Sequence, residues 1–170
     1  MPTALPKTIA KTGYAPPPPP GATEFKNARV ALLATRWNVE VVDRLLAGSR
    51  RCLAEWGVAD RHVREFRVPG AFELPLAASA VMRQGRYDAV VALGAVVRGD
   101  TPHFDFVAGE CARGLREASQ RHRVPLGFGV LTVETAAQAL ARAGRGRDNK
   151  GYEATAAALE MVRLLRAVDG

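Results

Sequence analysis

The sequence predicts an α/β protein in which a four-stranded parallel sheet lies between two layers of helices. From about residue 28, short apolar runs alternate with longer stretches whose apolar residues recur at helical spacing. Because a helix of this length between two strands is a crossover connection, neighbouring strands are expected to be parallel, with helices on both faces. We therefore predict one three-layer α/β/α domain over residues 28–170.

Each predicted strand is a compact apolar run. The third run, Ala89–Val97, contains no polar side chain, as expected for a strand buried on both faces of a sheet. The second run is followed by Pro69 and Gly70, a pair typical of turns. The four predicted strands are Val30–Ala34, His62–Val68, Ala89–Val97 and Pro125–Thr132.

The predicted helices follow these strands. Asn38 is expected to cap the first helix, which ends at Gly57. The apolar face of this helix consists of Val42, Leu45, Leu46, Ser49, Leu53 and Trp56. The later helices are Leu74–Gln84, Asp105–His122, Thr135–Ala143 and Tyr152–Ala167. The last of them is expected to bury Ala157, Ala158, Met161, Leu164 and Leu165.

Residues 1–27 differ in composition from the rest of the chain. They contain Pro2, Pro6 and the run Pro16–Pro20, and they offer little apolar surface to bury. We expect a disordered tail of polyproline character. The alternative is an arm that docks on a neighbouring subunit, with Phe25 as its anchor.

Composition narrows the classes of function. No apolar run is long enough to span a membrane and no apolar leader precedes the domain, so we expect a cytoplasmic protein. The net charge of +7 is spread along the chain, and aromatic residues make up only 6%, which favours a solvated surface and an anionic substrate over nucleic acid. Cys52 and Cys111 are expected to be buried, reduced thiols.

Glycine-rich nucleotide-binding motifs are missing from the sequence. No segment matches GxxxxGK followed by Ser or Thr. The segment Gly127–Gly129 lacks the third glycine of a dinucleotide-binding loop and lies inside a predicted strand. The sequence therefore gives no support for bound ATP or a nicotinamide cofactor.

Ligands of open parallel sheets bind beyond the carboxyl ends of the strands. The segments at these ends are Thr35–Asn38, Pro69–Glu73, Arg98–Asp105 and Thr132–Glu134. In the third segment, Gly99 permits a tight turn, and Thr101 offers a hydroxyl and an amide just before a helix, an arrangement that favours an anion such as phosphate. His103 in the same turn can transfer protons near neutral pH, or it can simply be solvated or cap the helix.

Three further residues each have a structural and a functional interpretation. Trp37 can stack on a flat heterocycle or belong to the core as a partly buried side chain. Glu73 can accept hydrogen bonds from ligand hydroxyls or cap the helix that it precedes. Arg142 can bind phosphate through two nitrogens or lie on the surface without a ligand. Sequence spacing leaves these alternatives open.

Five segments, in their order and spacing, resemble the lumazine synthase family. They are Val68–Pro75 (VPGAFELP), Gly94–Val107 (GAVVRGDTPHFDFV), Phe128–Thr132 (FGVLT), Gln138–Gly144 (QALARAG) and Asn149–Gly151 (NKG). The resemblance extends from about residue 28 to the C-terminal helix and omits only the Pro-rich segment. Five segments in register are specific, and they imply a flavodoxin-like fold.

The resemblance implies a transferase that needs no metal and no organic cofactor. Members of the family join 5-amino-6-(D-ribitylamino)uracil to 3,4-dihydroxy-2-butanone 4-phosphate, releasing phosphate and water and forming 6,7-dimethyl-8-ribityllumazine, the penultimate step of riboflavin biosynthesis. The implied substrate-binding residues are Trp37, Ala71, Phe72, Glu73, Ala95, Val96, Val97, Asp100, Thr101, Phe128 and Arg142. The implied catalytic residues are His103, for proton transfer, and Arg142, for the phosphate.

The resemblance also implies partners. Phe128 and Arg142 match positions that enter the site from the adjacent subunit, so we expect a homo-oligomer, either a pentamer or a sixty-subunit shell of pentamers. The loop Arg145–Asp148 differs from that of shell-forming members, which leaves the choice between pentamer, decamer and shell open. Riboflavin synthase is a further implied partner, whereas nucleic acid and membranes are not.

Two departures from the family pattern concern the site. Trp37 stands where the family more often has Phe, a change that keeps the capacity to stack. Asp100 places a carboxylate beside the expected phosphate-binding turn, where an inward-pointing side chain would weaken phosphate binding. The alternative function is a non-catalytic flavin- or lumazine-binding protein on the same scaffold. Such a protein would need neither His103 nor Arg142, and both are present.

Overall fold

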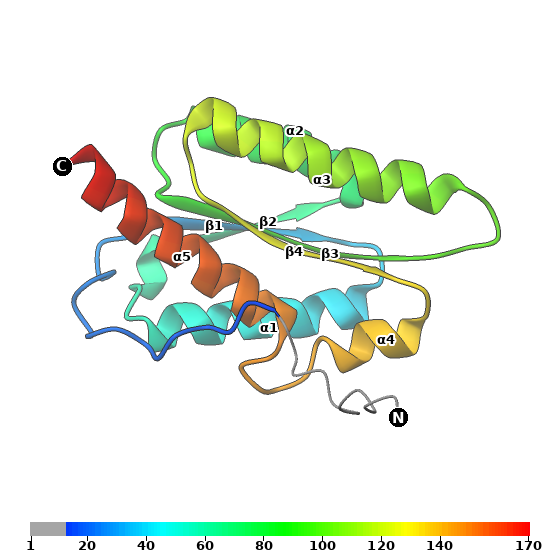
Figure 1. Cartoon of the computed structure of the whole chain (residues 1–170), viewed down its shortest axis with the longest axis horizontal. Coiled ribbons are helices and arrows are strands. Elements are labelled where there is room, and N and C mark those ends of the chain that lie inside the picture. The colour runs from blue at the N-terminus through cyan, green and yellow to red at the C-terminus, as the bar shows by residue number, and fades with distance from the viewer. Residues whose placement is uncertain (1–12) are drawn as a thin grey trace, which may run out of the picture.

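The computed structural model describes residues 13–170, which form a parallel sheet covered by helices on both faces (Figure 1). The strands are β1 (Val30–Thr35), β2 (Val63–Val68), β3 (Ala89–Val97) and β4 (Leu126–Val133). They lie in the order β2-β1-β3-β4, and all of these pairings are parallel. The predicted four-stranded sheet and the three-layer α/β/α class are confirmed.

The helices are divided between the two faces of the sheet (Figure 1). One face is covered by α1 (Val39–Glu55), α4 (Ala136–Ala141) and α5 (Lys150–Asp169), and the other by α2 (Leu74–Arg83) and α3 (His103–His122). Short 3-10 turns, Asp60–His62 and Ala71–Glu73, precede β2 and α2. All the predicted helices form, and only their ends shift.

Each face of the sheet has an apolar core of its own. Leu32 and Val91 belong to the core that faces α1 and α5, whereas Leu33 and Val90 belong to the core beneath α2 and α3. Alternate side chains of β1 and β3 therefore serve opposite cores, as the pleat of a strand requires. Strand β3 is buried continuously from its first residue to Ala95, which confirms the prediction that it lies inside the sheet.

Asn38 precedes α1 but does not cap it in the predicted way. Its backbone is left-handed, with φ 56°, and its side chain makes no capping hydrogen bond. A side-chain cap normally needs an extended backbone at this position. The Asn38 amide instead donates a hydrogen bond of 2.8 Å to the carbonyl of Ala95 at the end of β3. Asn38 therefore connects two strand ends and does not stabilise the helix terminus through its side chain.

Helix α5 buries a different face from the predicted one. Ala158 is buried as expected, but Met161 and Leu164 are 44% and 50% exposed. The buried positions are Gly151, Tyr152, Ala154, Thr155, Ala156, Ala158, Leu159 and Val162. The reason is close packing: a Cβ on Gly127 of β4 would lie only 2.5 Å from the backbone oxygen of Ala154. The helix approaches the sheet closely at Gly127, with Tyr152, Leu159 and Val162 buried, whereas Met161 and Leu164 face outward.

The described part of the N-terminal segment packs on its own chain. Phe25 is fully buried, and its ring centroid lies 5.5 Å from that of Trp56. The Tyr14 hydroxyl donates a hydrogen bond of 2.6 Å to Glu160 of α5. The prediction that Phe25 anchors an arm on a neighbouring subunit is therefore wrong, because the ring fills the core of its own domain. The tail was predicted for residues 1–27, of which residues 1–12 lie outside the described part of the chain.

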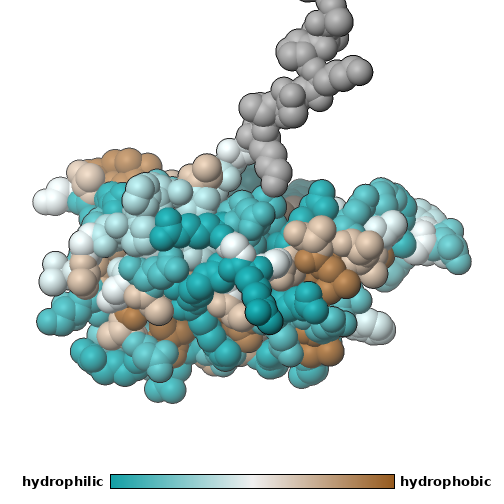
Figure 2. All heavy atoms as spheres, turned by 90° about the horizontal axis from the view of Figure 1, so that it is seen from below, coloured by the Kyte–Doolittle hydropathy of each residue, from teal (hydrophilic) through white to brown (hydrophobic). Residues whose placement is uncertain are grey.

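The surface and the thiols bear on two smaller predictions. Within residues 13–170, no helix combines the length and the apolar character needed to cross a bilayer. The face formed by α1, α4 and α5 carries a mixture of hydrophilic and hydrophobic residues (Figure 2).

Cys52 and Cys111 are buried, free thiols, as predicted. Burial raises the pKa of the Cys111 thiol to about 11, which makes it a poor nucleophile at neutral pH.

Candidate active site

The carboxyl ends of β1 and β3 and the turn after β2 surround a hollow of about 630 Å³. Segments far apart in the sequence meet here because parallel strands end at the same edge of the sheet. Of the residues predicted for the site, those that line the hollow are Trp37, Ala71, Phe72, Glu73, Ala95, Val96, Val97, Thr101 and His103. Asp100 is exposed beside the hollow without lining it, and Phe128 and Arg142 lie elsewhere.

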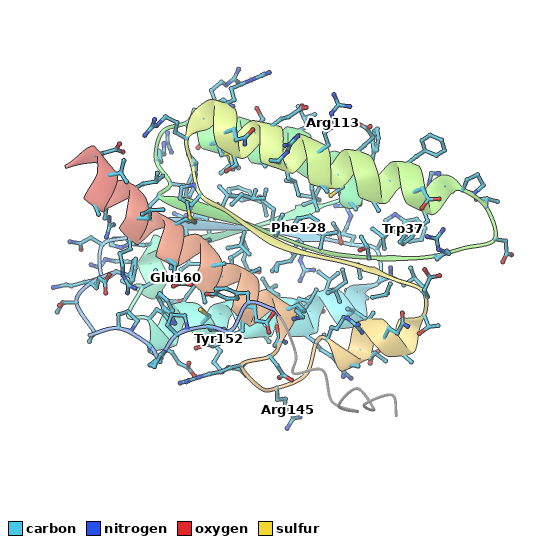
Figure 3. All side chains as sticks on the ribbon, viewed as in Figure 1. Trp37, Arg113, Phe128, Arg145, Tyr152 and Glu160 are labelled. Carbon is cyan, nitrogen blue, oxygen red and sulfur yellow. The ribbon has the colours of Figure 1, made fainter. Side chains whose placement is uncertain are left out.

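Trp37 presents its ring to solvent at the end of β1. It is 73% exposed, so the interpretation of Trp37 as a core residue is wrong. A Cβ on Gly70 would lie 3.1 Å from Trp37 Cδ1, so the turn after β2 leaves room beside the ring only because residue 70 is glycine. Figure 3 shows Trp37 at the end of the sheet where α3 begins. An exposed indole held in this way can stack on a flat ligand.

Glu73 ends the 3-10 turn after β2 and directly precedes α2. Its side chain makes no capping hydrogen bond with the helix, so helix capping does not account for it. The side chain lines the hollow together with the neighbouring Ala71 and Phe72, and Phe72 is 62% exposed. The Glu73 carboxylate therefore remains free to accept hydrogen bonds from the hydroxyls of a ligand.

The end of β3 forms the floor of the hollow. Ala95 is buried, and its carbonyl already accepts a hydrogen bond from the amide of Asn38. Val96 and Val97 are half-buried and complete the pairing with β4. The pairing with β4 holds one edge of this strand end, whereas the pairing with β1 stops at Leu93, so backbone polar groups on that edge face the hollow and can bind a ligand.

His103 is the first residue of α3, so the helix begins two residues before the predicted Asp105. The backbone N–H of His103 donates to the hydroxyl of Thr101 over 3.4 Å, which ties the turn to the start of the helix. The imidazole is exposed and lines the hollow, and it makes no hydrogen bond with residues 13–170. It is therefore available to exchange protons with a bound molecule, next to amides that favour an anion.

Arg98, at the edge of the hollow, contacts residues of two neighbouring segments. Its guanidinium hydrogen-bonds to Glu134 over 3.1 Å and to Asp105 over 3.3 Å. It also lies 4.3 Å from the ring centroid of Phe104. The hydrogen bond to Glu134, followed by that to Asp105, holds the pKa of Arg98 above its usual value. Arg98 is thus a permanent positive charge beside the turn that was expected to bind phosphate.

Phe128 and Arg142 lie together in a second hollow of about 470 Å³, between β4 and α5. Phe128 is 47% exposed on β4, and Figure 3 shows it in the middle of the molecule, away from the strand end that carries Trp37. Lys150 and Glu153 line the same hollow and form an ion pair of 2.6 Å. Within one chain, these residues do not contribute to the first hollow.

Asn149 holds the loop that follows Arg142. It is only 1% exposed, and its amide donates to the carbonyls of Gly144 and Arg44 over 2.7 and 3.1 Å. Its oxygen accepts from two backbone N–H groups in the first turn of α5 over 2.8 and 3.1 Å. The N–H of Lys150 in turn donates to the carbonyl of Arg142 over 2.9 Å. The backbone that carries Arg142 is therefore fixed to both α1 and α5.

Sequence reasoning gave Arg98 and Lys150 no role in the site and assigned Asn38 only a helix-capping role. Arg98 and Lys150 both lie within segments that resemble the lumazine synthases, so their positions carried a signal. Their roles in the site were not predicted: Arg98 pairs with Glu134, which follows a different strand, and Lys150 pairs with Glu153 on the same helix but in a hollow that only the fold brings together. Asn38 was expected to act locally, and its bond to β3 has no sequence signature.

Fold and site together define a class of protein. An α/β sheet presents an exposed aromatic ring, a free carboxylate and an imidazole beside a helix N-terminus, all at the carboxyl ends of its strands. Such a protein binds a flat, polar organic molecule together with an anion.

Comparison with known proteins agrees with this class. The sequence matches the family model described as 6,7-dimethyl-8-ribityllumazine synthase over residues 27–166. It is also 51% identical, over 145 residues, to a protein of Halorhodospira halophila named 6,7-dimethyl-8-ribityllumazine synthase. That match covers 85% of this chain and 93% of the relative. The chain belongs to the 6,7-dimethyl-8-ribityllumazine synthase family.

Proposed function

We propose that this chain catalyses the condensation of 5-amino-6-(D-ribitylamino)uracil with 3,4-dihydroxy-2-butanone 4-phosphate. The products are 6,7-dimethyl-8-ribityllumazine, phosphate and water, so the protein is a transferase of riboflavin biosynthesis. The observation that carries the proposal is the single hollow that combines Trp37, Glu73 and His103 with the turn at Thr101. Each group in it matches one chemical need of the reaction.

The uracil substrate is expected to bind between Trp37 and the end of β3. The exposed indole of Trp37 stacks on the pyrimidine ring, and the backbone of residues 95–97 binds the polar edge of the ring. Glu73, with the backbone of Ala71 and Phe72, accepts and donates hydrogen bonds along the ribityl chain. The free carboxylate of Glu73 supports this assignment, since no helix-capping bond competes for it.

The phosphate-bearing substrate is expected at the turn before α3. Thr101 offers its hydroxyl, and the backbone amides at the start of α3 favour the charge of the phosphate. Asp100 belongs to this turn and is exposed, which fits a contribution from its backbone and not from its carboxylate. The leaving phosphate thus departs from a site that already stabilises its charge.

Phe128 and Arg142 are proposed to complete the site of an adjacent subunit. Their position in a separate hollow, with Phe128 half-exposed on the edge strand β4, supports a contact with a second copy of the chain. Arg142 would then reach the phosphate and Phe128 the ring across the interface. The protein is therefore expected to be a homo-oligomer, with a pentamer or a shell of pentamers as the expected forms.

His103 is proposed to move protons during the condensation. Attack of the amine on the ketone gives an imine and releases water, and the later loss of phosphate and ring closure each require a proton to be removed or supplied. The exposed imidazole at the mouth of the hollow can accept and return these protons. A cytoplasmic location and an association with riboflavin synthase stay predictions of the family resemblance.

A turnover assay tests the proposal. The purified protein is mixed with both substrates, and the lumazine product is followed by its absorbance and fluorescence. The parent is expected to form product, and His103→Ala is expected to lower kcat by about 10²-fold without abolishing turnover, the lower end for acid–base groups because water also reaches this open site.

His122→Ala is the matched control, since His122 ends the same helix and hydrogen-bonds to Ser79 over 3.0 Å, outside the hollow. It should leave kcat unchanged. If a folded parent binds lumazine or flavin but forms no product, the proposal is wrong and the protein is a binding protein on the same scaffold.

A further inference from the structure

A guanidinium lies between two carboxylates at the edge of the first hollow. Arg98 forms ion pairs of 3.3 Å with Asp105, in the first turn of α3, and of 3.0 Å with Glu134, directly after β4. Its backbone N–H donates to the carbonyl of Val133 over 2.9 Å, which extends the β3–β4 pairing by one residue. Beneath the guanidinium lies the ring of Phe104, which also lines the hollow. Arg98 therefore contacts each segment that borders the turn.

Folding stability does not explain this arrangement. The side chains of Arg98, Asp105 and Glu134 are 39%, 60% and 61% exposed, and exposed ion pairs add little to the stability of a fold. Arg113 makes a comparable pair of 3.0 Å with Glu117, one helical turn along α3. Figure 3 shows Arg113 on the outer side of α3, away from the sheet. Exposed ion pairs of the same type therefore also occur away from the site.

The electrostatics of the turn give Arg98 a function. Asp100, Asp105 and Glu134 place three carboxylates around a turn that is proposed to bind a phosphate. Like charges at short range oppose one another, and the repulsion is strongest where solvent screening is weakest. The guanidinium of Arg98 pairs with both Asp105 and Glu134, so its single positive charge offsets part of their two negative charges at the place where a phosphate approaches.

We propose that Arg98 is a positioning residue for the phosphate-bearing substrate. It masks the carboxylates of Asp105 and Glu134 and fixes the first turn of α3, and it acts on the phosphate through these neighbours without binding it. The inference rests on the proposed function, because that function supplies the phosphate. It goes further in assigning a role to Arg98, whose guanidinium hydrogen-bonds to Glu134 and Asp105.

The first test is Arg98→Gln, which removes the positive charge and leaves both carboxylates unpaired. The KM for the butanone phosphate should rise roughly tenfold, because two uncompensated charges then face the phosphate. The KM for the ribitylaminouracil and kcat should each change by less than about twofold, and the rise in KM should shrink at high ionic strength. Arg98→Lys, which keeps the charge, should recover most of the loss.

The second test distinguishes masking from direct binding. In the triple variant Arg98→Gln, Asp105→Asn, Glu134→Gln, the carboxylates that needed masking are gone. Masking predicts a KM for the butanone phosphate within about threefold of the parent value. If Arg98 instead binds the phosphate itself, the triple variant will be as impaired as Arg98→Gln, and the inference is wrong.

Arg113→Gln is the matched control and should leave all constants unchanged. Titration of each protein with inorganic phosphate in a calorimeter gives a measure that does not depend on turnover, and Arg98→Gln should bind phosphate roughly tenfold more weakly than the parent. Equal phosphate affinity in the two proteins would overturn the inference. Failure of the parent to form lumazine would instead contradict the proposed function, while the calorimetric comparison still decides the role of Arg98.

Discussion

Two hollows that are lined by predicted site residues differ in how complete they are. The first, at the carboxyl ends of β1 and β3, gathers an aromatic ring, a carboxylate, a histidine and an anion-favouring turn from one chain. The second, between β4 and α5, holds Phe128 and Arg142 with the Lys150–Glu153 ion pair. Among residues 13–170, the lining of the first hollow includes no lysine or arginine, and the guanidinium of Arg98 beside it is paired with two carboxylates.

The difference indicates a division of labour between subunits. A site that lacks a free cation and a surface that offers Arg142 are complementary when two copies of the chain meet. The outward-facing Met161 and Leu164 of α5 agree with this, since large apolar side chains left exposed on a helix often mark a contact surface. Under the proposed function, the second hollow is the part of each subunit that completes the site of its neighbour.

Arg142→Ala should have the largest effect and is the sharpest test of the second hollow. If Arg142 meets the phosphate of an adjacent site, its removal leaves that charge without its partner, and kcat/KM for the butanone phosphate should fall by about 10³-fold. Steady-state kinetics with each substrate varied in turn will measure this. Arg145→Ala, three residues along the same exposed loop, serves as the control, and kinetics equal to the parent's in Arg142→Ala would show that the phosphate assignment is wrong.

Trp37→Ala should have an intermediate effect confined to the first hollow. Loss of stacking is expected to raise the KM for the ribitylaminouracil by about tenfold, whereas Trp37→Phe should retain most of the affinity because the ring remains. Because Trp37 is 73% exposed, neither change should lower the melting temperature by more than a few degrees. A similar rise in the KM of both substrates would mean that Trp37 shapes the whole site and does not hold the uracil ring specifically.

Phe128→Ala should have the smallest effect on folding and therefore separates stability from function. Phe128 is half-exposed, so its loss should cost the subunit fold less than about 1 kcal/mol. Phe25→Ala removes a fully buried ring and should cost about 3 kcal/mol. Chemical denaturation of both variants measures these values. A large loss of fold stability in Phe128→Ala would show that its ring supports its own subunit and not a neighbour.

The sequence predicted the architecture well because the strands are distinct in composition. Strand β3 was predicted with its observed bounds, since Ala89–Val97 is an uninterrupted apolar run. The buried face of α5 could not be predicted, because Ala is spread around that helix and the close approach at Gly127 is a tertiary constraint. Phe25 was assigned to an arm because the neighbouring segment is rich in proline. Its aromatic contact with Trp56, which lies far along the chain, could not be predicted from the sequence.

The candidate site also contains residues that the sequence predicted and residues that it did not. Residues of strand ends, such as Trp37 and His103, were predicted together because topology alone places them at one edge of the sheet. The separation of Arg142 from them within one chain was implied only by the family resemblance, and no periodicity in the sequence encodes it. No role was predicted for Arg98, because its role depends on two carboxylate partners, one of which follows a different strand.

The central claim, that each site is shared by two subunits, is tested most directly by complementation. Chains carrying His103→Ala and chains carrying Arg142→Ala are expressed together with different tags, and the mixed oligomers are purified through both tags. Random assembly would give about one site in four an intact His103 from one chain and an intact Arg142 from the next, so the mixture should regain about a quarter of the parent activity. Activity no higher than the mean of the two separate variants would contradict the account.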